Sequence, residues 1–179
     1  PDANIMALRV LDSNGSGNES DVWDAIQFAV DHGANIMSMS IGWRHSYSPD
    51  RASWRNSLNN ALAAGLVSSV AAGNDGEAQS SYPIPDNVGT PGDCPPPWLN
   101  PDQTLTGGLS DVVCIGATDD TDTIASFSSR GPVTWESVSG FNDSPYDPEM
   151  GLIRPDVSAP GVNIKSLDYA NVTGYADGW

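Results

Sequence analysis

The chain has 179 residues, a formal net charge of −16 and a single lysine, Lys165. A chain of this length forms one domain or a large piece of one, and it can bury roughly 70% of its unfolded surface. Nucleic-acid phosphates are bound by clustered Lys and Arg, so the shortage of both argues against a nucleic-acid partner. No apolar run is long enough to cross a bilayer, so no membrane association is expected.

The first part of the chain alternates between predicted strands and predicted helices. Short apolar runs indicate the strands, and apolar residues at helical spacing, such as Val22 and Ile26, indicate the helices. Asn18 is a favourable N-cap for the first helix, and Gly33 is a favourable residue just after it. The expected elements are a buried strand over Ile5–Leu11, a helix over 19–32, a strand over Ile36–Ile41, a helix from Ser48-Pro49 to Gly65, and a strand over Leu66–Ala71. This alternation predicts a parallel sheet with right-handed crossovers.

The second part of the chain is less regular. Residues 77–111 are rich in Pro, Gly and Asp and are too long for a plain connection, so we expect a functional loop or an insertion packed on the surface. A buried strand is predicted over Val112–Ala117 and a short strand over Ile124–Phe127. Residues 133–151 again have the composition of an acidic loop. The segment Arg154–Val162 is cut by prolines, which suits the edge of a sheet.

Two further features leave alternatives open. Cys94 and Cys114 are too few for a disulfide framework or a zinc site. Either they form one bridge, worth about 3 kcal/mol in the chain-entropy model, or Cys114 is a core residue of its strand. The acidic stretch Asp119–Asp122 lacks the Gly and Glu of an EF-hand loop, so a solvated turn is preferred there over a calcium site.

One short stretch, Ala71-Ala72-Gly73-Asn74-Asp75-Gly76, follows directly on a predicted strand. Taken alone, these residues indicate a turn. The end of a strand in an open parallel sheet is also where ligands bind. A side-chain amide held there is a neutral donor, suited to an oxygen that gains negative charge. Asn74 is therefore a candidate site residue, and the rest of the chain decides between the two interpretations.

Five segments together resemble the subtilisin-like serine proteases, the subtilases of peptidase family S8. They occur in the family's order and extend from one end of the chain to the other. Each alone is weak, but the set is specific. The segments are Asn4–Leu11 with the Gly15-Ser16-Gly17 loop, Ser38–Gly42, Ala71–Gly76, Phe127–Pro132 and Asp156–Gly161. The resemblance implies a three-layer α/β fold with a mostly parallel twisted sheet and flanking helices, here incomplete, with residues 1–179 as part of one peptidase domain and long loops at about 77–111 and 133–151.

The resemblance also implies roles for particular residues. Asn74 is expected to donate a hydrogen bond to the oxyanion of the tetrahedral intermediate. Gly15, Ser16 and Gly17 on one side, and Ser40, Ile41 and Gly42 on the other, are expected to hold an extended peptide as an added strand. Ala72 and Gly73, with residues 40–42, are expected to line the pocket for the residue before the cut. No cofactor is implied with certainty, although structural calcium is compatible with the family.

The resemblance places the catalytic Asp, His and Ser outside these 179 residues. The family's Asp and His motifs match positions before Pro1, and its nucleophile motif matches positions after Trp179. His32 closes a predicted helix, where a histidine is usually a dipole partner or a surface residue. His45 precedes a helix, and no Asp or Ser around it matches the family. We therefore expect the chain by itself not to hydrolyse peptides, and we expect its parent to be a secreted or cell-surface protease whose signal peptide is not in this chain.

Two other functional classes compete with this interpretation. The first is a subtilisin-like module that binds peptides or partners without catalysis. The second is a nucleotide-binding α/β domain, for which Gly15-Ser16-Gly17 would be the phosphate loop. That loop has acidic flanking residues and no basic one, which disfavours phosphate.

Overall fold

The structure is a computed structural model that describes residues 2–147, 149–167 and 175–177. The elements are α1 (Glu19–Asp31), β1 (Ile36–Met39), the 3₁₀ turn η1 (His45–Tyr47), α2 (Arg51–Ala63), β2 (Val67–Ala71), β3 (Val112–Thr118), β4 (Val157–Pro160), β5 (Lys165–Leu167) and β6 (Tyr175–Asp177). Strands β1 to β4 form a four-stranded sheet in that order, and β5 pairs with β6 separately. No helix in the described part of the chain is long and apolar enough to span a bilayer.

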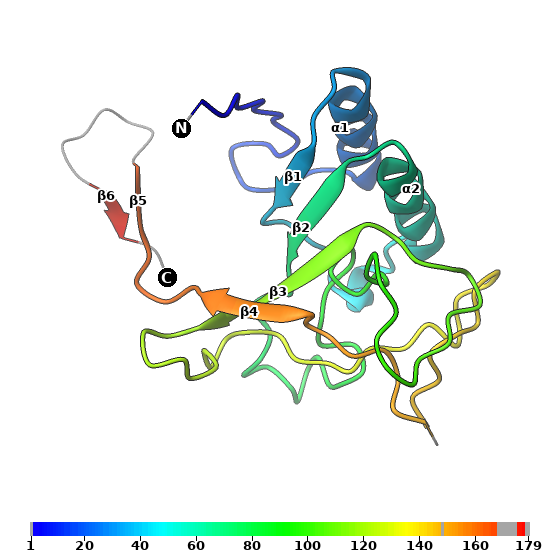
Figure 1. Ribbon diagram of the computed structural model, residues 1–179. Coiled ribbons are helices and arrows are strands. Elements are labelled where there is room, and N and C mark those ends of the chain that lie inside the picture. Colours follow the sequence, from blue (N-terminus) through cyan, green and yellow to red (C-terminus); the bar gives the residue numbers. More distant parts are fainter. Residues whose placement is uncertain (1, 148, 168–174, 178–179) are drawn as a thin grey trace.

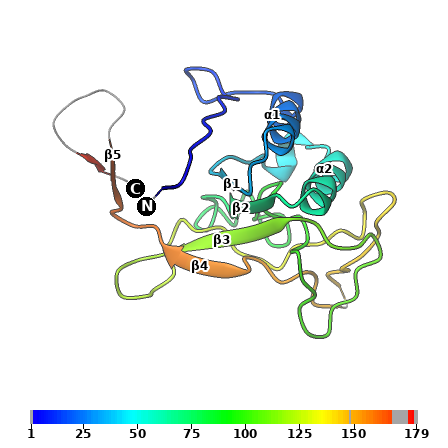
Figure 2. The same ribbon diagram turned by 45° about the horizontal axis from the view of Figure 1, so that its top comes forward.

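The four-stranded sheet is parallel throughout, as predicted. Its register pairs Ile36 with Val67, Val70 with Cys114, and Ala117 with Ala159. Helices α1 and α2 lie next to each other on the same side of the sheet (Figures 1 and 2). Along β3, buried residues alternate with half-buried ones, so one face of the sheet carries the core. The predicted parallel α/β sheet with flanking helices is confirmed.

Helix α1 begins and ends where its sequence indicates. Asn18 precedes it in an extended conformation, and the Asp21 carboxylate accepts from the Asn18 backbone N at 3.4 Å and from Asn18 Nδ2 at 3.2 Å. The polar groups at the end of a helix lack partners within the helix, and these hydrogen bonds supply partners at the start of α1. The helix buries Val22 and Ile26, which are core residues, and Gly33 follows it at φ +72.

Helix α2 begins two residues later than its Ser48-Pro49 start signal indicates. Asp50 is the N-cap, because its carboxylate accepts from Ser53 N at 3.0 Å. Trp54 and Leu58, which are four residues apart and so lie on one face of the helix, are fully buried. An aspartate one residue after a proline is therefore the better start signal here.

The predicted strand over Ile5–Leu11 is wrong. The structure assigns no strand to these residues, and the Ile5 side chain is 93% exposed. Strand β1 is an edge of the described sheet, with a partner on one side only. The apolar run shows that a segment can be buried, but a strand also needs a neighbour that satisfies its backbone groups. The short strand predicted over Ile124–Phe127 is likewise reduced to one isolated bridge, between Thr118 and Ile124.

Part of the long segment 77–111 lies in the core rather than on the surface. Val88 and Cys94 are fully buried members of the main core cluster. The side chain of Asn87 is buried as well: its Nδ2 donates to Asp75 O at 2.7 Å and to Tyr82 O at 2.6 Å. Burying an amide in this way requires that its hydrogen bonds be satisfied, and they are. The middle of the segment, residues 87–96, is therefore part of the core, whereas residues 77–86 and 97–109 are exposed or half-buried. The sequence of the segment has no period that would reveal this burial.

Both cysteines are free and buried. Burial raises the pKa of the Cys114 thiol to about 12, because a thiolate is poorly solvated there. Of the two alternatives left open by the sequence, the structure therefore supports Cys114 as a core residue of its strand, and it contains no disulfide between Cys94 and Cys114.

A buried ion pair connects α2 to the second long loop. Arg55 Nη1 and Nη2 each donate to a different carboxylate oxygen of Asp143, both at 3.0 Å. Both side chains are 1% exposed. The guanidinium also lies over the rings of Trp135, at 5.0 Å, and Phe141, at 4.3 Å. This bidentate pair explains how an acidic loop with no secondary structure is fixed to the helix.

Candidate functional site

A cavity of about 220 Å³ lies where the carboxyl ends of the parallel strands meet. Residues from β1 to β4 and from the turns that follow them line it. Four residues predicted for the site are among them: Ser40, Ala72, Gly73 and Asn74. The carboxyl edge of an open parallel sheet is the usual place for a ligand. The structure thus brings together residues that are more than 30 positions apart in the sequence.

The turn that carries Asn74 is pinned by a neighbouring segment. Ser129 N donates to Gly73 O, and Asp75 N donates to Ser129 Oγ, both at 3.0 Å. Gly73 has φ +109, and a Cβ there would lie 2.9 Å from Ser129 Oγ. Glycine is therefore required by both conformation and space. The segment 127–132, singled out in the sequence for its resemblance, is what fixes this turn.

The side chain of Asn74 is left available by this arrangement. Asn74 is exposed, and within the described residues its amide has no hydrogen-bond partner. The next residue, Asp75, is buried and accepts from Arg44 Nη2 at 2.7 Å and from Arg44 Nε at 2.9 Å. The hydrogen bond to Asp75 raises the pKa of Arg44. The turn is thus held on both sides of Asn74, and an amide on a rigid turn is suited to donating toward a ligand in the cavity.

The remaining predicted substrate residues lie outside this cavity. Asp12 builds the Gly15-Ser16-Gly17 loop, because its carboxylate accepts from Ser16 N at 2.9 Å. Gly15 there has φ +76. Gly17 lines a second cleft instead, together with Trp43, the residue after Ile41 and Gly42. The second cleft thus lies next to both predicted edges. Gly15, Ser16, Ile41 and Gly42 line neither the cavity nor this cleft.

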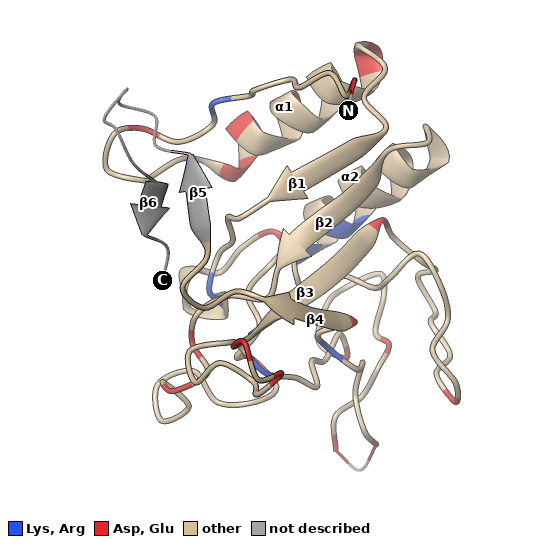
Figure 3. Ribbon diagram, turned by 60° about the vertical axis from the view of Figure 1, so that its left-hand side comes forward, with Lys and Arg blue, Asp and Glu red and all other residues tan. Residues whose placement is uncertain are grey.

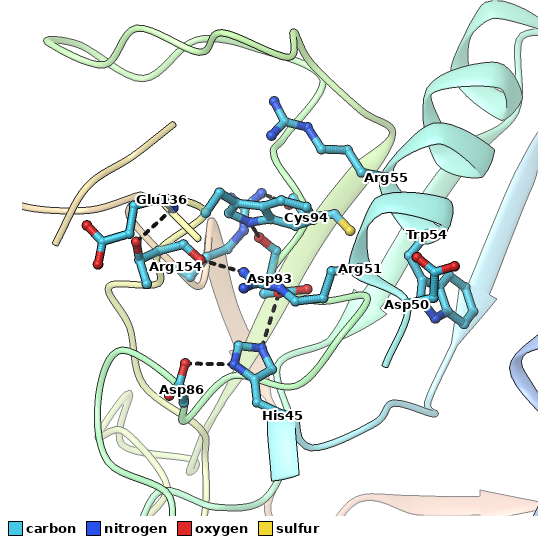
Figure 4. Close-up of polar contacts among 12 residues, drawn as sticks. His45, Asp50, Arg51, Trp54, Arg55, Asp86, Asp93, Cys94, Glu136 and Arg154 are labelled. Atoms are coloured by element: carbon cyan, nitrogen blue, oxygen red, sulfur yellow. Dashed lines mark hydrogen bonds and ion pairs between the residues drawn. The ribbon is translucent and has the colours of Figure 1, made fainter. Parts of the chain in front are cut away.

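Neither histidine lies in the cavity. His32 Nδ1 is 2.8 Å from Phe28 O, and its ring stacks on Phe28 at 3.8 Å between centroids. His45 instead contacts two carboxylates: Nδ1 is 2.7 Å from an Asp86 oxygen, and Nε2 is 3.2 Å from an Asp93 oxygen (Figure 4). Each imidazole therefore has a partner that accounts for its position.

Asp93 is the centre of a buried network that the sequence does not reveal. Its carboxylate accepts from Arg51 Nε at 2.8 Å, and its backbone O accepts from Trp135 Nε1 at 2.9 Å. The guanidinium of Arg51 lies 4.3 Å from the Trp135 ring centroid. The only signal in the sequence is an acidic residue in a proline-rich loop, which usually indicates a solvated position.

The network shifts the pKa values of its members. Burial alone lowers the pKa of His45, but the hydrogen bonds to Asp86 and Asp93 outweigh it and raise that pKa to about 9. Burial alone raises the pKa of Asp93, but the charge of Arg51 and the hydrogen bond to His45 outweigh it and lower that pKa to about 2. Both groups are therefore charged at neutral pH.

We expect the stability supplied by His45 to depend on pH. Its folded pKa of about 9 lies above the unfolded value of 6.5, so the contribution is fully present below pH 6.5 and is lost as the pH rises through 9. Urea unfolding of the parent protein and of its His45→Gln variant, at pH 6.5, 8 and 10, measures this. The difference in unfolding free energy shrinks as the pH rises. His32→Gln is the control, and a His45 difference that is the same at all three pH values contradicts the expectation.

The acidic turn at Asp119 is satisfied by its own backbone. One Asp119 oxygen accepts from Thr121 N and from Thr123 N, both at 2.9 Å, and from Thr121 Oγ1 at 2.8 Å. The hydrogen bonds from Thr121 and Thr123 lower the pKa of the carboxyl. Across the described residues, no group of three or more His, Cys, Asp or Glu side chains is placed to hold a metal ion.

The fold and the cavity define a parallel α/β protein with a candidate ligand site at the carboxyl ends of its strands. Comparison with known sequences makes this more specific. The model of the subtilase family matches residues 1–177, and the chain therefore belongs to that family.

Curated relatives bear names of the same kind. The chain is 32% identical over 181 residues to the serine protease AprX of Bacillus subtilis (strain 168), with 96% of this chain and 34% of AprX covered. It is 30% identical over 165 residues to thermitase of Thermoactinomyces vulgaris, with 90% of this chain and 50% of thermitase covered. The chain thus spans between a third and a half of the length of these proteins.

Solved structures give the same fold. Sphericase matches with a TM-score of 0.58 and 26% identity, over 90% of this chain and 44% of sphericase. The prenylagaramide maturation protease PagA matches with a TM-score of 0.60 over 93% of this chain and 46% of PagA. At 21% identity, the likeness to PagA concerns the fold alone.

Proposed function

We propose that residues 1–179 are the middle portion of the catalytic domain of a secreted serine endopeptidase, and that Asn74 is its oxyanion-hole donor. One observation carries the proposal: Asn74 lines the cavity at the carboxyl end of β2, on a turn fixed by Ser129, and its amide has no hydrogen-bond partner in the described part of the chain. Membership of the subtilase family and the names of the relatives support the reaction class.

In this proposal the chain supplies electrostatic stabilisation and substrate positioning, and other parts of the protein supply the triad. A serine attacks the scissile carbonyl, a histidine takes and returns its proton, and an aspartate orients the histidine. The carbonyl oxygen becomes an oxyanion, toward which Asn74 Nδ2 donates. The substrate backbone pairs with residues 15–17 and 40–42 as an added strand, which suits a peptide or protein substrate.

A serine-directed fluorophosphonate tests the proposal. The complete protein that contains these residues is expected to be labelled on one serine and to cleave casein. The isolated chain is expected to be neither labelled nor active, because none of its serines has an activating histidine: His32 and His45 have other partners.

The competing function is a subtilisin-like module that binds peptides without cleaving them. It predicts that the complete protein binds casein peptides but is not labelled and releases no fragments. Labelling of the isolated chain contradicts the proposal in a different way, because it places a nucleophile within these 179 residues.

A further inference from the structure

A second cleft, of about 530 Å³, lies between the start of α1 and the segment around η1. Gly17, Glu19, Trp23, Trp43 and Tyr47 are among its lining residues. Gly17 ends one predicted substrate edge, and Trp43 directly follows the other. A peptide held between these edges therefore passes the cleft, and a side chain of that peptide has room to enter it.

The walls of the cleft are aromatic and well fixed. Trp23 and Trp43 both pack against Trp54, with ring centroids at 5.7 Å and 5.3 Å. Trp54 is completely buried and so holds the two lining rings in place. Tyr47 adds a third lining ring that is 67% exposed. Aromatic faces arranged around an open space attract cations, because each ring face carries negative charge density.

Glu19 supplies a fixed negative charge in the same cleft. Its Oε1 accepts from Trp54 Nε1 at 2.7 Å, and both of its carboxylate oxygens lie 3.2 Å from Asp50 N. These donors are neutral, so they orient the carboxylate without cancelling its charge. A carboxylate anchored beside aromatic rings is prepared for a cationic group before that group arrives.

The cations along the neighbouring chain are committed elsewhere. Arg44 is paired with Asp75 at 2.7 Å, and Arg51 with Asp93 at 2.8 Å. Figure 4 shows Arg51 directed to Asp93, whereas Asp50 and Trp54 lie on the opposite side of the start of α2. None of the cleft's lining residues is Lys or Arg, and α1 carries acidic residues without a basic one (Figure 3). Glu19 is therefore the one charged side chain among the described residues that line the cleft.

We propose that this cleft is a specificity site that binds an arginine or lysine side chain of the substrate peptide. The proposal rests on the proposed peptidase function, and it names the substrate class of that site. The alkyl stem of the basic residue packs on Trp43 and Trp23, and its charged end lies between Tyr47 and the Glu19 carboxylate. An arginine benefits twice, since its planar guanidinium both stacks on a ring and pairs with a carboxylate.

The test compares peptides that differ in one charge. Each member of a series of fluorogenic peptides carries either arginine or its neutral isostere citrulline at one position. The rate at which the complete protease cleaves each peptide is measured. We expect one position at which kcat/KM is about 10-fold higher for arginine, which is the scale of a partly desolvated cation–π contact. In Glu19→Gln, that ratio is expected to fall to about 2-fold, because the rings remain and the charge is gone. Tyr47→Leu is the second variant and is expected to lower the ratio as well.

The outcomes are distinguishable. Cleavage of the citrulline peptide shows that each variant is folded, and Asp24→Asn, an exposed acid on α1 outside the cleft, is the matched control with an unchanged ratio. Equal cleavage of arginine and citrulline at every position, or a preference for phenylalanine at the responsive position, overturns the cation site and leaves the peptidase function standing. Cleavage of no peptide overturns the peptidase function itself.

Discussion

On the proposed function, replacing Asn74 by alanine in the complete protein is expected to lower kcat by about 100- to 1,000-fold and to change KM little. Loss of one oxyanion donor has an effect of this size in subtilisin, a member of the same family. The amide contributes mainly once the substrate oxygen becomes charged, so the transition state loses more than the ground state does. Steady-state kinetics on a casein-derived peptide measure both constants.

The control for this variant is Asn59→Ala, which removes the same side chain from an exposed position of α2. It should leave both constants unchanged. An Asn74→Ala enzyme with full kcat contradicts the assignment. A raised KM with normal kcat indicates instead that Asn74 binds the substrate in its ground state.

Replacing Asp143 by asparagine is expected to lower the free energy of unfolding by about 3–5 kcal/mol, the usual cost of removing one partner of a buried ion pair. Arg55 would keep its charge in a site where both side chains are now 1% exposed. The same carboxylate accepts from Thr106 N at 3.0 Å, so a second loop loosens with it. Urea unfolding of the parent protein at neutral pH measures the change.

Asp147→Asn is the matched control, because Asp147 is an exposed acid in the same loop. Its effect should stay within about 0.5 kcal/mol. If the two variants unfold at the same urea concentration, the Arg55–Asp143 pair does not anchor the loop. A double variant, Arg55→Met with Asp143→Leu, should recover much of the loss, since it leaves no uncompensated charge in the core.

The secondary structure near the sheet was predictable for a local reason. In α1, the cap Asn18, the buried Val22 and Ile26, and the terminating Gly33 all act within a few residues of one another. The same holds for β3, whose apolar run matches the observed Val112–Thr118. The prediction of a strand over Ile5–Leu11 failed because a strand depends on a neighbouring strand, which its own residues do not specify.

In the candidate site as well, some features were predictable from neighbouring residues in the sequence and others were not. The position of Asn74 and Gly73 at the cavity was predictable because these turn residues follow directly on a strand, and the ends of parallel strands form the usual ligand edge. The stabilisation of that turn by Ser129 was not predictable, since the hydrogen bond from Asp75 N to the Ser129 side chain joins residues 54 positions apart. The buried carboxylates Asp93 and Asp143 were missed because their arginine partners, Arg51 and Arg55, lie on a distant helix.

By itself, the sequence determined the order of the main helices and parallel strands, the family, and the place of Asn74 at the end of a strand. These properties depend on periodicity and on short motifs, which are local. Only the tertiary structure decided that the middle of segment 77–111 is core, that both cysteines are free, and that Glu19 shares a cleft with Trp23, Trp43 and Tyr47. Burial and charge pairing are properties of neighbours in space, and long-range contacts bring those neighbours together.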